Sequence, residues 1–293
     1  MRAVNLIPGV DSHDKGLPRL FSEGYESQLS QILPTYNYQH FTRRQMEIIS
    51  GASSIIVNWP GVLQAQTPAA SLSKIPQGLD PQILEAFITH AEADIAGAAG
   101  HINPHGSLTL NSPTFQSMRI LRESVKQGGN PLTIYNNFLD GCAKEIYSLD
   151  VWDISDTATL GNIRAITRVA NLLRTPNAEE FARIVETFSL IDCSETIVKG
   201  LGSTGIDDRA PNLEFLPALL IGIVRNHGLE AALKYLAILL EVLVKADSDT
   251  NPNDKTGMYE VNLERLARQA QKNELNLTQS PRFTLRRGIF IPL

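Results

Sequence analysis

The sequence predicts a mainly α-helical protein, a single domain over residues 1–293 with about ten helices, and two observations lead to this expectation. One is the most apolar stretch of the chain, residues 213–245, which has the pattern of two buried helices. The other is a dipeptide that recurs in the middle of the chain, in which a helix-capping residue stands directly before a proline. Together they indicate a helical core at 21–278, between an N-terminal arm at 1–20 and a C-terminal arm at 279–293.

The apolar stretch at 213–245 is expected to form a buried helical hairpin around which the rest of the chain packs. The charged residues of its second half recur at i, i+4, i+11 and i+15, on one narrow stripe of a helix: Glu230, Lys234, Glu241 and Lys245. A helix that is apolar over the rest of its surface is normally central in a core. Its uninterrupted apolar segments are shorter than the ~20 residues that cross a membrane, so we expect no membrane span.

The composition is that of a globular protein. A chain of 293 residues with 43% hydrophobic residues can bury a substantial core without cross-links. The formal net charge of -5 and the isoelectric point of about 5.7 give no general attraction to nucleic acid, so we expect no nucleic-acid partner. Only Cys142 and Cys193 occur, both in apolar helical patterns that are typical of buried thiols in a reducing compartment. We therefore expect a cytoplasmic protein, or one exported without a cleaved signal peptide.

Several helix starts are predicted by the dipeptides of a capping residue and proline. Proline at the first helical position costs no hydrogen bond, because the N–H that it lacks has no partner inside the helix. The dipeptides are Asp80-Pro81, Ser112-Pro113, Asn130-Pro131 and Thr175-Pro176. With the apolar residues that follow them, they predict helices over 81–97, 113–126, 131–148 and 176–189.

Other helices are predicted from the spacing of apolar residues alone, over 22–33, 157–173 and 257–272. Thr42 and Gln45 have the spacing of a capping box and open a further helical turn. Residues 54–57 fit either a strand or a buried helix end, which Trp59-Pro60-Gly61 closes, and residues 68–78 are expected to be a loop.

The C-terminal arm alternates loosely between polar and apolar residues and ends in the apolar run 289–293. Each large apolar side chain contributes about 1.5–3 kcal/mol when fully buried, so the arm is expected to bind a surface. We expect that surface to be the core of the same chain, because the preceding helix is tethered to the hairpin and keeps the effective concentration of the arm high.

The best candidate for a functional site is the stretch 89–105. On a continuous helix His90, Asp94 and His101 lie within about 40° of one another, because steps of four and eleven residues nearly return to one face. His105 joins them if the helix continues past the glycines. Imidazole and carboxylate groups at this spacing are a normal arrangement of metal ligands. The sequence thus predicts His90, Asp94 and His101 as catalytic residues and, together with His105, as ligands of a divalent transition metal.

A structural interpretation competes with this one. His90 shares its stripe with Ile83 and Phe87, so a histidine at the edge of the core that is bonded to Asp94 fits the same pattern. The motif matches no zinc-hydrolase pattern, and the choice between a metal site and a metal-free acid–base site stays open.

Two further motifs favour a structural interpretation. The glycines at 200–205 have the spacing of a pyrophosphate-binding loop, but the third glycine does not open a predicted helix, so we expect a flexible loop. Residues 247–253 resemble a calcium-binding loop, but Pro252 replaces the required glycine and Met258 the bidentate glutamate. We expect a solvated connector between helices there.

Two classes of function are consistent with these observations. The first is an enzyme or small-molecule-binding protein whose His/Asp cluster faces a helical pocket, with histidine as general base or metal ligand. The second is a non-enzymatic assembly or effector-type protein whose terminal arms bind neighbouring subunits or another protein. The expected partner is accordingly a small-molecule ligand or, in a homo-oligomer, further copies of the chain.

Overall fold

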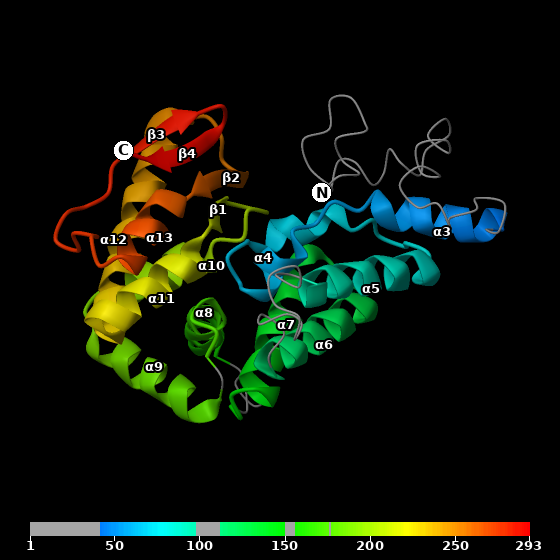
Figure 1. Ribbon diagram of the computed structural model, residues 1–293, viewed down its shortest axis with the longest axis horizontal. Coiled ribbons are helices and arrows are strands. Elements are labelled where there is room, and N and C mark those ends of the chain that lie inside the picture. Colours follow the sequence, from blue (N-terminus) through cyan, green and yellow to red (C-terminus); the bar gives the residue numbers. More distant parts are fainter. Residues whose placement is uncertain (1–41, 98–111, 150–155, 176) are drawn as a thin grey trace. The chain divides into compact units, whose positions relative to one another are not determined.

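The computed structural model of the protein describes residues 42–97, 112–149, 156–175 and 177–293 (Figure 1). Most of these residues are helical and a small sheet accompanies them, which confirms the mainly α-helical class. The chain groups into two compact units, one of residues 1–57 and 74–107 and one of residues 58–73 and 108–293. The single domain over 1–293 therefore stays a prediction. None of the described helices is both long and apolar enough to cross a membrane.

The described part of the first unit holds two helices, α3 (Arg43–Ser53) and α5 (Pro81–Gly97), which pack against each other. Thr42 forms the predicted capping box: its hydroxyl accepts from the N–H of Gln45, and its own N–H donates to the Gln45 side chain at 2.8 Å. Asp80 caps the start of α5 through the N–H of Gln82 and also pairs with Arg44. Both predicted helix starts are confirmed.

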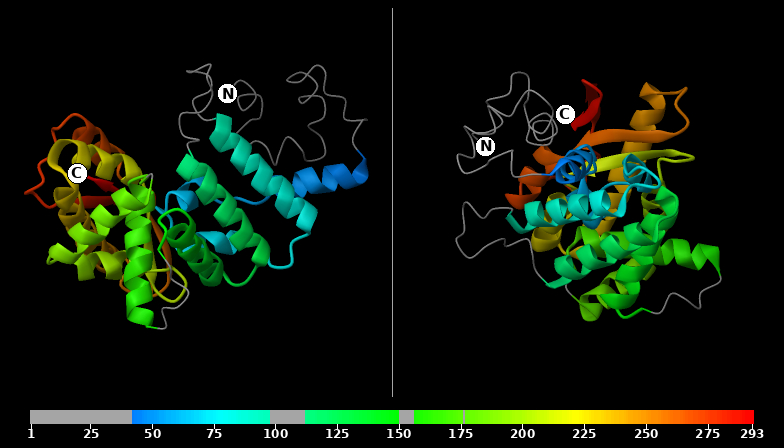
Figure 2. Two further views of the ribbon diagram at one scale, coloured as in Figure 1. Left: turned by 90° about the horizontal axis from the view of Figure 1, so that it is seen from below. Right: turned by 90° about the vertical axis from the view of Figure 1, so that its right-hand side faces the viewer.

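The second unit begins with several helices, and the sequence predicts four of them. The helices are α4 (Trp59–Leu63), the 3-10 helix η3 (Ala69–Lys74), α6 (Ser112–Gln127), α7 (Pro131–Glu145), α8 (Thr157–Leu172), α9 (Ala178–Leu190) and α10 (Ser194–Gly202). Asn130 caps α7 as expected, and Asp156 caps α8. Asn177 caps α9, so this helix begins two residues later than predicted. Figure 2 shows these helices in two further views.

The apolar stretch contains α11 (Leu216–His227) and α12 (Leu229–Thr250), which pack against each other. Gly228, with φ of 87°, makes the turn between them. The residues of the two helices that are fully buried are Leu216, Leu219, Leu220, Ile223, Leu236, Leu239 and Leu243. Helix α12 also packs on α10 at Gly200, where an added Cβ would lie only 2.9 Å from Leu240 Cδ1. A larger residue at this position would force the Leu240 side chain to move, so glycine allows the two helices to approach closely.

The sheet has the strand order β1-β2-β4-β3. Its strands are β1 (Arg209–Glu214), β2 (Gly257–Asn262), β3 (Phe283–Arg286) and β4 (Ile289–Pro292). The pairs β1–β2 and β2–β4 are parallel, and β3–β4 is antiparallel. Helices α11 and α12 connect β1 to β2, and the connection from β2 to β4 contains α13 (Glu264–Gln271) and then β3. The C-terminal part of the chain is therefore a mixed sheet whose parallel strand pairs are joined by helical crossovers, because parallel neighbours need long connections.

The sheet corrects one prediction and confirms another. The helix predicted over 257–272 begins only at Glu264, because residues 257–262 alternate with a period of two and bury Tyr259 and Val261. The C-terminal arm docks on its own core as expected. It forms β3 and β4, and Phe290, 2% exposed, lies edge-to-face against Tyr259 with 5.7 Å between ring centroids.

Other local expectations are also wrong. Trp59-Pro60-Gly61 begins α4 instead of closing an element, because the side chain of Asn58 accepts from the N–H of Gly61 and caps the new helix. The expected loop at 68–78 contains η3. Both cysteines are free thiols, but only Cys142 is buried, whereas Cys193 is partly exposed.

Candidate functional site

The predicted histidine site lies only partly within the residues that the structure describes. His90 is an exposed residue of α5, and Asp94 belongs to the same helix. His101 and His105 lie outside the described residues. Among the residues that the structure describes, no group of three or more histidine, cysteine, aspartate or glutamate side chains could hold a metal ion. The assignment of His90, Asp94, His101 and His105 to a catalytic or metal site therefore stays a prediction.

The glycine motif is not a phosphate-binding loop. Gly200 and Gly202 belong to the last turn of α10, where the sequence suggested a flexible loop. In the turn that follows, Oδ1 of Asp208 accepts from the N–H groups of Thr204 and Gly205, each at 2.9 Å. A phosphate would need such N–H groups free, and here a carboxylate of the protein already occupies them.

The segment that resembles a calcium loop is also structural. Helix α12 continues to Thr250, and Asp247 is 4% exposed. Its carboxylate accepts two hydrogen bonds from the guanidinium of Arg209, at 2.9 and 2.6 Å, and a third from the amide of Asn251. Asp247 thus joins the end of α12 to the start of β1, and the solvated connector that we expected is wrong for this residue.

A polar cluster that the sequence did not reveal lies on one face of β1 and β2. In the parallel register Asn212 lies beside Glu260, and the Asn212 amide donates to Glu260 Oε2 at 2.7 Å. Two residues further on, Glu214 lies beside Asn262, whose amide donates to Oε2 of Glu214 at 3.2 Å. All four side chains are half-buried. We call these four residues the Asn/Glu cluster.

Glu214 has the most perturbed environment in this cluster. Burial raises the pKa of its carboxyl group, the nearby charge of Glu260 raises it further, and the hydrogen bond from Asn262 acts in the opposite direction. Glu214 therefore keeps its proton to a higher pH than an exposed glutamate does. The orientation of Asn262 is fixed from two sides, because its Oδ1 also accepts from the N–H of Glu264 at the start of α13, at 3.0 Å.

A cleft opens beside the Asn/Glu cluster, at the ends of β2 and β4. It has a volume of about 380 Å³ and is lined by Asn262, Glu264, Arg265, Arg286, Ile291, Pro292 and Leu293. Sites in parallel sheets with helical crossovers typically lie beyond the carboxyl ends of the strands, as this cleft does. We call it the carboxyl-edge cleft.

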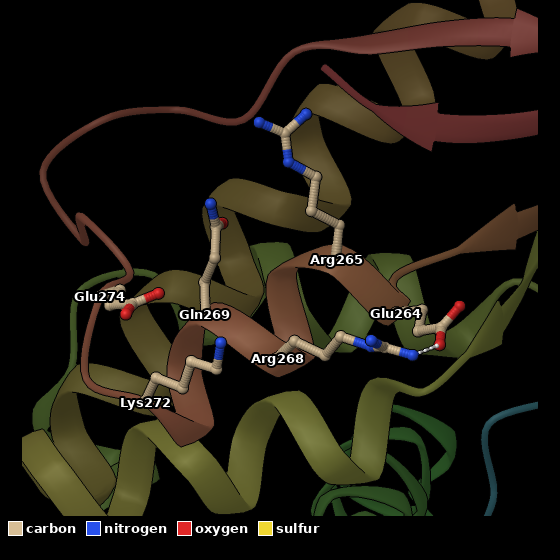
Figure 3. Close-up of a pocket in the computed structure, with 6 residues that line it drawn as sticks. All are labelled: Glu264, Arg265, Arg268, Gln269, Lys272 and Glu274. Carbon is tan, nitrogen blue, oxygen red and sulfur yellow. Dashed lines mark hydrogen bonds and ion pairs between the residues drawn. The ribbon is translucent and has the colours of Figure 1, made fainter.

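A second hollow, of about 430 Å³, runs along the outer side of α13 (Figure 3). Figure 3 shows that Arg268 is turned toward Glu264, with which it pairs at 2.5 Å, whereas Arg265 and Gln269 point to another side of the helix.

Within the described residues, neither Arg265 nor Arg286 forms an ion pair with a carboxylate. Two uncompensated arginines thus reach the carboxyl-edge cleft, one from α13 and one from β3.

The turn from β1 into α11 is strained. Phe215 follows Glu214 directly and has φ of 66° and ψ of 9°, a left-handed conformation that is unusual for an aromatic residue. Its side chain is 43% exposed, so little burial compensates for the strain. Backbone strain of this kind costs about 1–3 kcal/mol and is concentrated at functional sites, which fits a position at the edge of the Asn/Glu cluster.

Phe215→Gly is expected to leave the free energy of unfolding unchanged or to raise it by up to about 1 kcal/mol, because glycine adopts the left-handed conformation without strain. Urea denaturation followed by circular dichroism measures this. The matched control is Phe115→Gly, which removes an exposed phenylalanine from the regular helix α6 and should cost about 0.5–1 kcal/mol. A larger loss at Phe215 than at Phe115 would mean that the Phe215 ring, not the backbone, decides the stability of the turn.

The signal that could have revealed the Asn/Glu cluster is its alternation. Asn212-Leu213-Glu214 and Glu260-Val261-Asn262 are two short polar-apolar-polar segments that mirror each other. Each is only three residues long, and period-two patterns of that length also occur by chance in helices and loops. Only the pairing of the two strands brings the segments together.

Comparisons with known proteins place the chain in a family. Neither the curated proteins nor the solved structures contain a match to it. The sequence profile described as a family of unknown function, DUF6829, matches residues 29–282, which include the Asn/Glu cluster and most of the described residues. Since the match covers well over half of the chain, the protein belongs to this family of unknown function, DUF6829.

Proposed function

We propose that the protein binds a small molecule that carries a carboxylate or phosphate group, and that it does so in the carboxyl-edge cleft. The observation that supports this is the pair Arg265 and Arg286, which line one cleft from two different elements without forming an ion pair in the described part of the chain. A guanidinium group matches the planar geometry of a carboxylate or phosphate and binds it through paired hydrogen bonds. Two such groups in one cleft favour an anionic ligand.

The remaining lining of the cleft suits a small ligand. Ile291 and Pro292 supply apolar surface, and small-molecule sites are mostly apolar with a few polar groups that fix the orientation of the ligand. The amide of Asn262 uses one of its two N–H groups for Glu214, which leaves the second as a donor. Because Glu214 and the start of α13 both fix Asn262, this donor is held in one direction before the ligand arrives.

The test compares two variants with a matched control. Arg265→Gln and Arg286→Gln should each weaken the binding of an anionic probe by about 10-fold or more, because hydrogen bonds to charged groups contribute about 1.5–3 kcal/mol. The probes are 4-methylpentanoate and inorganic phosphate, titrated into the full chain and followed by NMR shifts or calorimetry. The control is Arg287→Gln, an exposed neighbour of Arg286 that does not line the cleft but removes the same charge.

Equal weakening in all three variants would mean that only the general field of the basic residues attracts the probe, and the proposal would fail. It would also fail if no small molecule with a carboxylate or phosphate group, including these probes, binds at concentrations up to about 10 mM, since weaker binding is not specific recognition.

The proposal favours one of the two classes of function that are predicted from the sequence. The carboxyl-edge cleft, which belongs to the second unit, supports the small-molecule-binding class, whereas His90 belongs to the first unit. An enzymatic function and a metal at His90 stay predictions. The assembly class also stays a prediction, and the C-terminal arm on which it partly depends is paired with β2 of the same chain.

A further inference from the structure

The polar face of the sheet is divided by charge across its width. At one level of the sheet the register places Asn212, Glu260, Ile289 and Arg286 side by side, from β1 across to β3. At the next level it places Glu214 beside Asn262 and Ile291 beside Thr284. Carboxylates thus occupy the β1 and β2 side, an arginine occupies the β3 side, and two isoleucines on β4 lie between them.

The opposite charges on this face do not neutralise each other. Glu260 and Arg286 lie on strands that are two positions apart, so their backbones are about 9–10 Å apart, at about 4.8 Å per strand. No ion pair joins them, and none is formed by Glu214 or Arg265 within the described residues. The gap between the negative and positive sides is of the size that a small molecule with both charges can bridge.

The carboxylates have acceptor capacity left for such a ligand. Glu260 accepts from Asn212 and Glu214 accepts from Asn262, each through one oxygen, whereas a carboxylate can accept about four hydrogen bonds. An ammonium group has three donors and a positive charge, and it is the group that these oxygens would bind best. A ligand that carries only negative charge would instead bring its charge toward two glutamates.

The surface between the charges is apolar and open. Ile289 is 38% exposed, and Ile291 is half-buried and lines the carboxyl-edge cleft. An aliphatic side chain placed on these two residues would bury apolar surface that is now in contact with water.

We infer that the ligand lies across the carboxyl-edge cleft and the Asn/Glu cluster beside it, and that it is a zwitterion of the amino-acid type with an aliphatic side chain. Its ammonium group binds Glu260 and Glu214, its carboxylate binds Arg265 and Arg286, and its side chain lies on the isoleucines of β4. This inference rests on the proposed function, which requires only the anionic group. The ammonium subsite is the new element.

Three probes of similar shape separate the binding of the anionic group from the binding of the ammonium group. They are L-leucine, 4-methylpentanoate, which is leucine without the amino group, and 3-methylbutylamine, which is leucine without the carboxylate. L-leucine is expected to bind the full chain at least about 10-fold more tightly than either truncated probe, since each lacks one charge-assisted contact. If 4-methylpentanoate binds as tightly as L-leucine, the proposed function stands and the zwitterion is excluded. If neither L-leucine nor 4-methylpentanoate binds at about 10 mM, the inference is overturned as well.

A variant tests the ammonium subsite by itself. Glu260→Gln keeps an oxygen that can accept from Asn212 but loses the charge, so it should weaken L-leucine about 10-fold and leave 4-methylpentanoate unchanged or bound more tightly. Glu241→Gln, an exposed glutamate of α12, is the control and should change neither affinity. Equal effects of Glu260→Gln on both probes, with a normal thermal transition, would overturn the inference.

Discussion

Leu236→Asp is expected to unfold the second unit completely. Leu236 is fully buried in the middle of α12, where an aspartate would place an unpaired carboxylate among apolar side chains. Such a substitution costs more than about 5 kcal/mol, which is comparable to the whole stability of a typical domain. Circular dichroism should show the loss of most of the helical signal, because α6 to α13 belong to this unit, and the cooperative thermal transition should disappear.

The matched control lies on the same helix. Val244→Asp makes the same kind of change at a side chain that is 50% exposed, so it should cost less than about 1 kcal/mol and leave the thermal transition in place. If both variants are equally stable, α12 is not the core element. If both unfold, the exposed side of α12 is covered by something that the described residues do not include.

The buried helices could be predicted because their signal is long. Helix α12 spans 22 residues, and over that length the charged stripe separates from the apolar surface without ambiguity. The helix starts were predictable for a second reason: a capping side chain acts within three residues of its own position, so the sequence contains the whole interaction. Asn130 and the pair Thr42 and Gln45 are examples, and each makes the predicted hydrogen bonds.

The strands could not be predicted in the same way. Residues 257–262 lie next to α13 in the sequence, and a single helix over 257–272 is expected to bury Val261, Leu266 and Ala270. The five-residue step from Val261 to Leu266 does not, however, return to the same face of a helix. What makes these residues a strand is their pairing with 209–214 and with β4, which are distant in the sequence. Such pairing between distant segments overrides the local preference for a helix, and a single sequence does not show which segments pair.

The candidate site was missed for the same physical reason. The histidines at 89–105 form a pattern that the sequence shows directly because they lie on one short stretch, whereas the carboxyl-edge cleft combines two segments, 262–265 and 286–293. Arg265 comes from α13, Arg286 from β3 and Asn262 from the end of β2. None of these residues belongs to a motif, and only the sheet order β1-β2-β4-β3 brings them to one edge.

A second feature of the core that the sequence did not reveal is a buried arginine without a carboxylate partner in the described residues. Arg168 on α8 is 4% exposed, and its guanidinium donates to the carbonyl oxygens of Ala65, Thr67 and Leu201. It lies 5.5 Å from the centre of the Tyr135 ring, and the Tyr135 hydroxyl donates to the same Thr67 carbonyl at 3.0 Å. Arg168 thus joins the loop after α4 and the end of α10 to α7 and α8.

Arg168→Met is expected to lower the free energy of unfolding by about 3–5 kcal/mol, the range for removing one partner of a buried charged contact. Methionine fills similar space but has no donor, so three buried carbonyl groups lose a hydrogen bond, at about 1–3 kcal/mol for each that water does not reach. The gain from no longer burying a charge offsets part of this loss. Denaturation in urea, with the midpoint and the slope both fitted, measures the change.

Two further variants decide whether the hydrogen bonds or the mere size of the side chain matter at this position. Arg183→Met makes the same substitution at an exposed arginine of α9, whose pairs with Glu179 and Glu180 lie at the surface, and it should change the stability by less than about 0.5 kcal/mol. Arg168→Lys keeps the charge, but its single ammonium group cannot reproduce the fork that spans Ala65 and Leu201, so it should recover only part of the loss. If Arg168→Met is as stable as the unchanged protein, then water or other groups satisfy the three carbonyls, and Arg168 does not hold the loop after α4 in place.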